Sequence, residues 1–152
     1  MTPDINILVA AQRPQHSHHL LARSWLSQAR RSSLAYAESG RTTESPLRLI
    51  TVVMASYLRL VTNAKVVVGP TPTNSAIEFL DVLLATPGIT VLESTSVWPR
   101  LRQLSLDLSL TANAIPDALI AATVLQANEV LVTFDKDFLK LLPAKNLLLL
   151  TP

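Results

Sequence analysis

The stretch AIPDALIAATVLQANEVLVTFDKD, residues 114–137, places three aspartates at the ends of two apolar elements. Its first half is apolar on nearly every face of a predicted helix, and Asp117 is the only charged residue there. Val130 to Phe134 is short and rich in β-branched residues, which predicts a buried strand. Asp135 and Asp137 follow that strand immediately. The stretch therefore predicts a helix, a strand and an acidic strand end in succession.

Helices and short apolar runs alternate in the same way over the rest of the chain. Ile5 to Ala11 is a nearly continuous apolar run, typical of an element buried on both faces and in part helical, and Arg31 to Pro46 is a predicted surface loop. The other predicted helices are His18 to Ala29, Leu47 to Asn63, Thr73 to Thr86 and Val97 to Leu108, and the other strands are Ile89 to Leu92 and Leu147 to Leu150. Strands separated by helices require crossover connections, so we expect one α/β domain over residues 1–152 with a parallel sheet covered on both faces.

Charge is scarce in this chain. Its 152 residues are 49% apolar and 16% charged, enough for one apolar core, and the lack of cysteine excludes a disulfide scaffold and a zinc ribbon. The net charge of +2 does not indicate nucleic-acid binding by charge alone, although residues 1–65 carry eight basic and three acidic side chains. The most apolar stretch, residues 47–61, contains two arginines and is too short to span a bilayer. Without a signal peptide, the expected location is cytoplasmic, with no membrane contact.

Asp4, Asp117 and Asp135 end apolar elements from three separate parts of the chain. Ligands of open α/β folds bind beyond the carboxyl ends of the strands, and two of these carboxylates are predicted to lie there. A buried carboxylate must be paired, hydrogen-bonded or bound to a cation. Oxygen ligands without His or Cys favour Mg²⁺ or Mn²⁺ over zinc, so the three together predict a cation site. Taken singly, a cap, a turn or the helix dipole explains each of them equally well.

Other polar residues lie near these carboxylates in the sequence. Asn6 is a candidate neutral oxygen donor, although strand alternation alone also explains its position. Ser56, Arg59 and Asn63 form a polar stripe at i, i+3 and i+7 of an apolar helix. Arg59 is either a phosphate contact beside the cation site or a cation that reaches solvent or pairs with a buried Asp. The histidines of residues 16–19 precede a helix in a polar segment, and we assign them a structural or solvated role.

Four groups of residues carry a further signal through their order and spacing. They are PDINILVAA (3–11) with HSHH (16–19), YLRLVTN (57–63), NAIPDALIAA (113–122) and LVTFDKDF (131–138). Together they resemble the PIN-domain ribonucleases, and more narrowly the VapC toxins of type II toxin–antitoxin modules. The resemblance extends over essentially the whole chain.

The resemblance implies a three-layer α/β/α PIN-like fold, a short and mainly parallel sheet, and Mg²⁺-dependent endoribonuclease activity with Mn²⁺ as a substitute. It also implies an RNA substrate, a cognate antitoxin and a homodimer. By resemblance, Asp4, Asp117 and Asp135 are catalytic metal ligands, and Asp137 shares or replaces the last of these. Asn6 and Arg59 are the candidate substrate contacts. Further contacts to the RNA backbone are expected from arginines of the first half: Arg13, Arg30 and Arg31.

One position departs from the family pattern. Most PIN domains carry a Glu three residues before the helix arginine, where this chain has Ser56. The metal site is then weaker, holds one ion or borrows Glu44 from the loop. An alternative function follows: a degenerate PIN-like module that binds RNA or a partner without hydrolysis. A haloacid-dehalogenase-like phosphatase, suggested by Asp4-Ile5-Asn6, lacks the second Asp of that family's opening motif.

Overall fold

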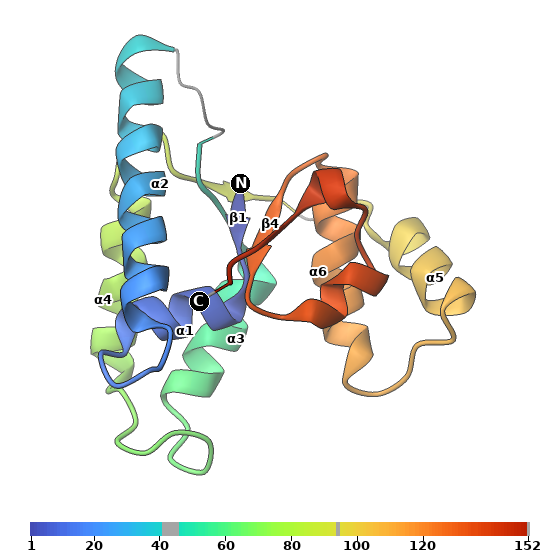
Figure 1. Ribbon diagram of the computed structural model, residues 1–152, viewed down its shortest axis with the longest axis horizontal. Helices are drawn as coiled ribbons and strands as arrows, with labels where there is room; N and C mark the ends of the chain where they lie inside the picture. Colours follow the sequence, from blue (N-terminus) through green and yellow to red (C-terminus); the bar gives the residue numbers. More distant parts are fainter. Residues whose placement is uncertain (41–45, 94, 152) are drawn as a thin grey trace.

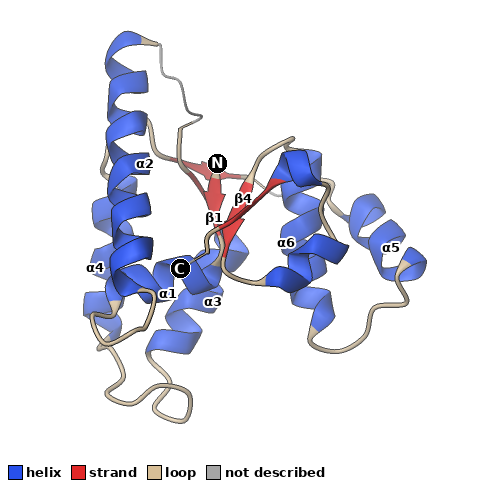
Figure 2. Cartoon of the chain, viewed as in Figure 1, coloured by secondary structure: helices blue, strands red, loops and turns tan. Residues whose placement is uncertain are grey.

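The computed structural model describes residues 1–40, 46–93 and 95–151, and Figure 1 shows the course of the chain. Short strands stand between longer helices, as Figure 2 shows. The elements in chain order are β1 (Thr2–Pro3), α1 (Ile5–Gln12), α2 (His19–Ser39), β2 (Arg48–Ile50), α3 (Thr51–Val61), α4 (Thr73–Leu84), β3 (Thr90–Leu92), α5 (Trp98–Asp107), α6 (Ala114–Gln126), β4 (Leu131–Thr133), the 3-10 helices η1 (Lys136–Lys140) and η2 (Ala144–Asn146), and β5 (Leu147–Leu149).

Every strand pair in the described part of the chain is parallel. β1 pairs with β4, which pairs with β5, and β2 pairs with β3. The backbone N–H of Arg48 donates to the carbonyl of Met1 over 2.9 Å, so the two sheets adjoin in the order β3-β2-β1-β4-β5. Parallel strands end at one edge, which places the residues after β1 and after β4 together.

Helices cover both faces of these strands. In Figure 2, α1 to α4 gather on one side of the strands and α5 and α6 on the other. α1 packs against α2, α3 and β4, and this enclosure explains why its side chains are nearly all apolar. α6 lies against α5 and is buried along most of its length. The predicted three-layer α/β/α fold with a short parallel sheet is confirmed.

Apolar side chains from all three layers form the core. The largest fully buried ones include Tyr57 of α3, Phe138 of η1 and Leu131 of β4. Among the described residues, no helix combines the length and apolarity needed to cross a membrane.

Several predicted elements agree with the structure. The helix predicted over residues 114–126 is α6 with the same bounds, and those over residues 73–86 and 97–108 are α4 and α5. The three predicted strands after residue 88 are β3, β4 and β5.

Two predictions for the first half need correction. The run from Ile5 to Ala11 lies wholly within α1, because the Asp4 carboxylate accepts from the Ile5 N–H and caps a helix there. The segment from Leu47 to Asn63 is not one helix, since β2 precedes α3. Apolar side chains suit both states, and the strand partner that decides between them, β3, lies some forty residues later in the chain.

The predicted loop over residues 31–46 is helical as far as Ser39. Ser33 is fully buried, and its Oγ accepts a hydrogen bond from the N–H of Leu47 over 2.8 Å. The Ser33 carbonyl lies so close to Gly88 that a Cβ at that glycine would stand 2.0 Å from the oxygen. These long-range contacts hold the polar second half of α2 against the rest of the fold.

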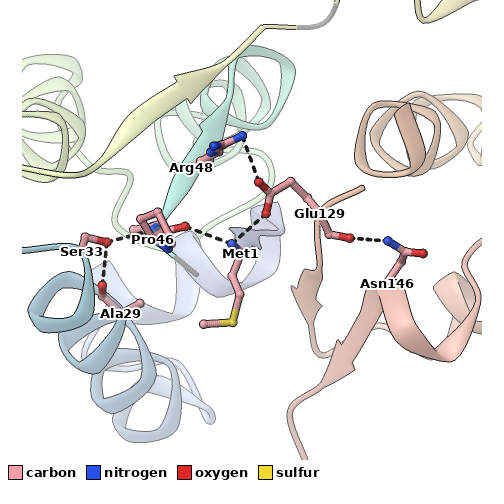
Figure 3. Close-up of polar contacts among 8 residues, drawn as sticks. Met1, Ala29, Ser33, Pro46, Arg48, Glu129 and Asn146 are labelled. Carbon is pink, nitrogen blue, oxygen red and sulfur yellow. Dashed lines mark hydrogen bonds and ion pairs between the residues drawn. The ribbon is translucent and has the colours of Figure 1, made fainter. Parts of the chain in front are cut away.

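Glu129, between α6 and β4, connects several strands through polar contacts, which Figure 3 shows. Its Oε2 accepts from the amino group of Met1 over 2.9 Å, and its Oε1 lies 3.1 Å from Nη1 of Arg48. Its backbone carbonyl accepts from Nδ2 of Asn146 over 2.6 Å. Only 11% of the Glu129 side chain is exposed, so these bonds are partly shielded from water. They tie β1, β2 and the approach to β5 to the start of β4.

Glu129→Ala removes the carboxylate that both cations face. We expect the free energy of unfolding, measured by urea denaturation, to fall by about 2 kcal/mol, the range for a hydrogen bond to a charged group. Glu78→Ala on the exposed face of α4 is the matched control and should change it by less than about 0.5 kcal/mol. Equal stabilities of the two variants would contradict this role.

Candidate active site

Asp4 stands between β1 and α1 and is 4% exposed. Its Oδ1 accepts from the Ile5 N–H over 2.7 Å, so it is the helix cap that the sequence left open as one explanation. Its Oδ2 accepts from Thr133 Oγ1 over 2.6 Å. The register that pairs Pro3 with Val132 sets Asp4 beside Thr133, and one carboxylate thereby serves both the cap and the site.

Thr133 is the residue of this site that the sequence analysis missed. It ends β4 and is fully buried. Its Oγ1 donates to Asp4 and accepts from Nδ2 of Asn6 over 2.8 Å and from the N–H of Asp135 over 2.9 Å. A β-branched residue in a strand is usually explained by strand propensity alone. The only sequence signal for a role of Thr133 was its position just before the acidic residues that follow the strand.

Asn6 lies between the same partners. Its Nδ2 donates to Asp4 Oδ2 over 2.7 Å as well as to Thr133, and its Oδ1 accepts from the N–H of Phe134 over 3.2 Å. Both ends of the amide therefore bind within the protein. These bonds give Asn6 a positioning role, holding Asp4 against the end of β4, while its role as a substrate contact stays a prediction.

The electrostatics of Asp4 link it to the other two carboxylates. Burial raises the pKa of Asp4 from 3.8 to about 6, against hydrogen bonds from Thr133 and Ile5 that lower it. The charges of Asp117 and Asp135 raise it further. Asp4 therefore feels the charge of carboxylates from two other segments, while their sharing of one cation stays a prediction.

Asp117 lies in the first turn of α6 and is half-buried. Burial raises its pKa, and the charges of Asp135 and Asp137 raise it further. No hydrogen bond to its side chain occurs within the described ranges. This carboxylate therefore feels the charge of Asp135 and Asp137 and has no hydrogen-bond partner among the described residues.

Asp135 and Asp137 form a turn at the start of η1. Oδ1 of Asp135 accepts from the N–H of Asp137 over 2.8 Å, which is the turn that the sequence offered as an alternative. Asp137 is 71% exposed, and its Oδ1 lies 2.8 Å from Nζ of Lys140. An ion pair this exposed contributes little stability.

The predicted polar stripe on residues 47–63 is incomplete. Arg59 lies exposed in the last turn of α3 and makes no ion pair with any described residue, so its pairing with a buried Asp is excluded. Asn63 lies beyond the end of α3, where its Oδ1 accepts from the N–H of Lys65. Ser56 is half-buried within the helix. Glu44 lies outside the described residues.

Arg13 is not the anion contact that the sequence suggested. It is 7% exposed, and its guanidinium donates to the carbonyls of Val68 and Gly69 over 2.7 and 3.1 Å. It also donates to Oγ1 of Thr71 over 3.3 Å. Arg13 holds the connection between α3 and α4 and is unavailable to a ligand at the surface.

Two of the histidines of residues 16–19 make internal contacts. Nδ1 of His19 lies 2.8 Å from the Ala10 carbonyl, and His19 is buried. The ring of His18 stacks on Phe134 with 4.6 Å between centroids. These contacts confirm the structural role expected for this segment.

The carboxylates suit a divalent cation by their chemistry. In the described ranges, no three His, Cys, Asp or Glu side chains form a ready-made metal cage. Mg²⁺ does not require one, because it keeps several waters and binds through one or two carboxylates together with substrate phosphates. Asp4 and Asp117 supply oxygen donors of that kind, and a cation would offset the burial and, to a smaller extent, the neighbouring charges that raise their pKa values.

Comparison with known proteins agrees with this arrangement. The sequence matches the PIN domain family over residues 1–141. Ribonuclease VapC25 of Mycobacterium tuberculosis is 30% identical over 139 residues, which cover 89% of this chain and 88% of that protein. Ribonuclease VapC43 of the same organism is 32% identical over 136 residues, covering 89% and 85%. A crystal structure of VapBC2 from Rickettsia felis, bound to a DNA fragment from their promoter, contains a chain with the same fold (TM-score 0.62, 18% identity, 99% of this chain and 98% of that one).

The raised pKa of Asp4 predicts the pH dependence of stability in EDTA. The unfolded chain loses this proton near pH 3.8 and the folded chain near pH 6, so ionisation favours unfolding between these values. We expect the free energy of unfolding to fall as the pH rises from 4 to 6, by about 2 kcal/mol from Asp4 alone. Urea denaturation at a series of pH values measures it.

Asp4→Asn keeps a cap for α1 and removes the ionisable group, so its stability should change less over this pH interval than that of the wild type. A wild-type stability that rises from pH 4 to pH 6 in parallel with the variant's would contradict the prediction.

Proposed function

This chain belongs to the PIN-domain family, and from that premise we propose that it is a Mg²⁺-dependent endoribonuclease, the toxin of a type II toxin–antitoxin pair. The observation that carries the proposal is the electrostatic coupling of Asp4, Asp117 and Asp135 at the carboxyl edge of a parallel sheet. We infer cleavage of RNA by this chain from its relatives, which are named ribonucleases.

The residues of the site have different roles in the proposed reaction. Asp4 and Asp117 hold the cation, and Asp135 adds negative charge beside them. The bound ion supplies Lewis acidity to the phosphate and to the attacking water. Asn6 and Thr133 fix the Asp4 carboxylate, so it need not reorient during hydrolysis. The carboxylates repel a polyanion when no cation is present, which makes RNA binding depend on the metal.

The proposed partners follow the same relatives. We propose a cognate antitoxin because the chain shares its fold with one in a VapBC structure, and a homodimer in line with the resemblance to VapC toxins. Mn²⁺ is the proposed substitute for Mg²⁺, since both prefer oxygen ligands.

Ser56 favours a second candidate function. Its hydroxyl replaces the carboxylate that most PIN domains carry at this place in α3, so the site has one negative charge fewer. A module that binds RNA or a partner without hydrolysis would show filter binding with no cleavage at any concentration of Mg²⁺ or Mn²⁺.

The first test of the proposed activity is cleavage of structured RNA by the purified protein with Mg²⁺. Asp117→Asn removes a charge that has no structural partner, and cleavage should fall at least about 100-fold with the fold unchanged. EDTA should abolish cleavage. Asp81→Asn, on the exposed face of α4, is the matched control and should cleave like the wild type. Equal cleavage by Asp117→Asn would reveal a contaminating nuclease and refute the assignment.

Arg59→Ala tests the proposed phosphate contact. Because Arg59 is exposed and unpaired among the described residues, its removal should leave the melting temperature unchanged. RNA affinity should fall, and the slope of log Kd against log salt should decrease by about 1. Arg102→Ala on α5 provides the control for a general loss of positive charge. A large drop in melting temperature, or an unchanged salt slope, would argue against the contact.

A further inference from the structure

A cavity of about 280 Å³ opens beside Asp117, between the start of α6 and the segment that follows β4. Figure 1 shows the connection from α5 leading into the start of α6. The cavity is lined by Leu110, Asn113, Ala114, Asp117, Asp137, Lys140 and Leu141. Its position makes it the neighbour of whatever binds at the carboxylates, because Asp117 belongs to both.

The side chain of Asn113 is free at this cavity. An Asn before a helix usually caps it through its side chain, but here no such bond forms. The carbonyls of Thr111 and Ala112 instead accept from the N–H groups of Ala114 and Ile115 over 3.0 and 3.2 Å. Within the described chain, the Asn113 amide has no partner, and both its donor and its acceptor remain available.

The connection that carries Asn113 is held in an unusual conformation. Ser109 and Ala112 have φ values of 49° and 43°, in the left-handed region that residues with a Cβ rarely adopt. Four such residues other than glycine occur in the described chain, and two of them lie in this short connection. Strain of this kind persists where the surrounding structure enforces it, and it is enriched at ligand sites.

The lining selects the chemistry of the ligand. Leu110, Ala114 and Leu141 offer apolar surface for the flat faces of a ring. Asp117 and Asp137 outnumber Lys140, so the cavity disfavours a phosphate. The oxygens of Asn113 and Asp137 accept hydrogen bonds, which favours a ligand with N–H donors at its edge. The exposed pair of Asp137 and Lys140 is weak and can exchange partners with a ligand.

We propose that this cavity binds adenine or cytosine, whose amino group lies beside a ring-nitrogen acceptor on one edge of the base, and that Asn113 contacts that edge. An amide side chain forms such pairs with an adenine edge, and a carboxylate accepts from the amino group of cytosine. Uracil has no amino group and offers only one ring N–H between two carbonyls, so it satisfies fewer of the acceptors of Asn113 and Asp137. In the proposed function, the phosphate attached to this base lies at the carboxylates. A preference for adenine or cytosine beside the cleaved bond therefore rests on the proposed nuclease function. Binding of a free nucleoside in the cavity does not depend on that function.

The test has one arm that needs no cleavage. Adenosine, cytidine and uridine carry no phosphate and are titrated into the ¹⁵N-labelled protein. The backbone amide signals of the cavity residues are followed by NMR and, in the proteins that keep Asn113, its side-chain amide signals are followed too. Adenosine and cytidine should shift these signals and uridine should bind about tenfold more weakly, the difference expected for one specific base contact. Asn113→Ala should lower the affinity for adenosine to that for uridine, and Ala114→Leu, which fills the cavity, should abolish binding. Asn74→Ala, an exposed Asn of α4, serves as the control.

The second arm maps cut sites in a random-sequence RNA with Mg²⁺. Wild-type protein should favour adenine or cytosine beside the cut, and Asn113→Ala should lose this preference while still cleaving. Nucleoside binding without cleavage would uphold the cavity and overturn the nuclease function. Cleavage by a protein whose Asn113 signals move equally, or not at all, with all three nucleosides would overturn the cavity's role and leave the nuclease function intact.

Discussion

The parallel pairing of β1 with β4 is the constraint on which the site depends. The N–H of Asp4 donates to the Val132 carbonyl over 2.9 Å, and this bond fixes the register at the end of both strands. A shift of one residue would turn each side chain to the opposite face. Asp4 would then leave Thr133, and the bonds through Asn6 would break. Glu129 supports the same register from the other end of β4 through its contacts with β1 and β2.

This constraint brings together groups that repel one another. Asp4 is nearly fully buried, and its carboxylate lies in the field of two others. Two internal hydrogen-bond donors, Thr133 and Asn6, compensate part of the cost of burial, and the backbone N–H that it caps supplies a third. The remaining cost of burial, together with the charges of Asp117 and Asp135, destabilises the folded chain when Asp4 is ionised, and a bound cation would offset this cost. The Asp4 carboxylate therefore lowers the stability of the folded chain when it is ionised.

The structure shows where the few charged side chains of this chain lie. Asp4 is held by hydrogen bonds from Thr133, Asn6 and the N–H of Ile5, and Arg13 is enclosed by backbone oxygens, so these two buried charged side chains have defined partners. On the α6 side, the site continues into an apolar cavity with one free amide. In the proposed function, the carboxylates attract the cation that binds a phosphate, and the largely apolar cavity beside them contacts the base that the phosphate carries.

The sequence by itself determined the helices and strands of the second half and the three carboxylates. In that half, the spacing of apolar residues and the turn residues after each element define the elements from local sequence alone, as in α6. The few charged residues are easy to identify because most of their neighbours are apolar. Only the tertiary structure decided that residues 48–50 form β2, that α2 continues to Ser39, and that Thr133 binds Asp4. Each of these depends on a partner far away in the chain, such as β3 for β2 and Gly88 for α2. The local spacing of apolar residues reflects which face of one element is buried, and it can be read from that element alone. Strand register and hydrogen-bond partners are fixed only when distant elements pack against each other.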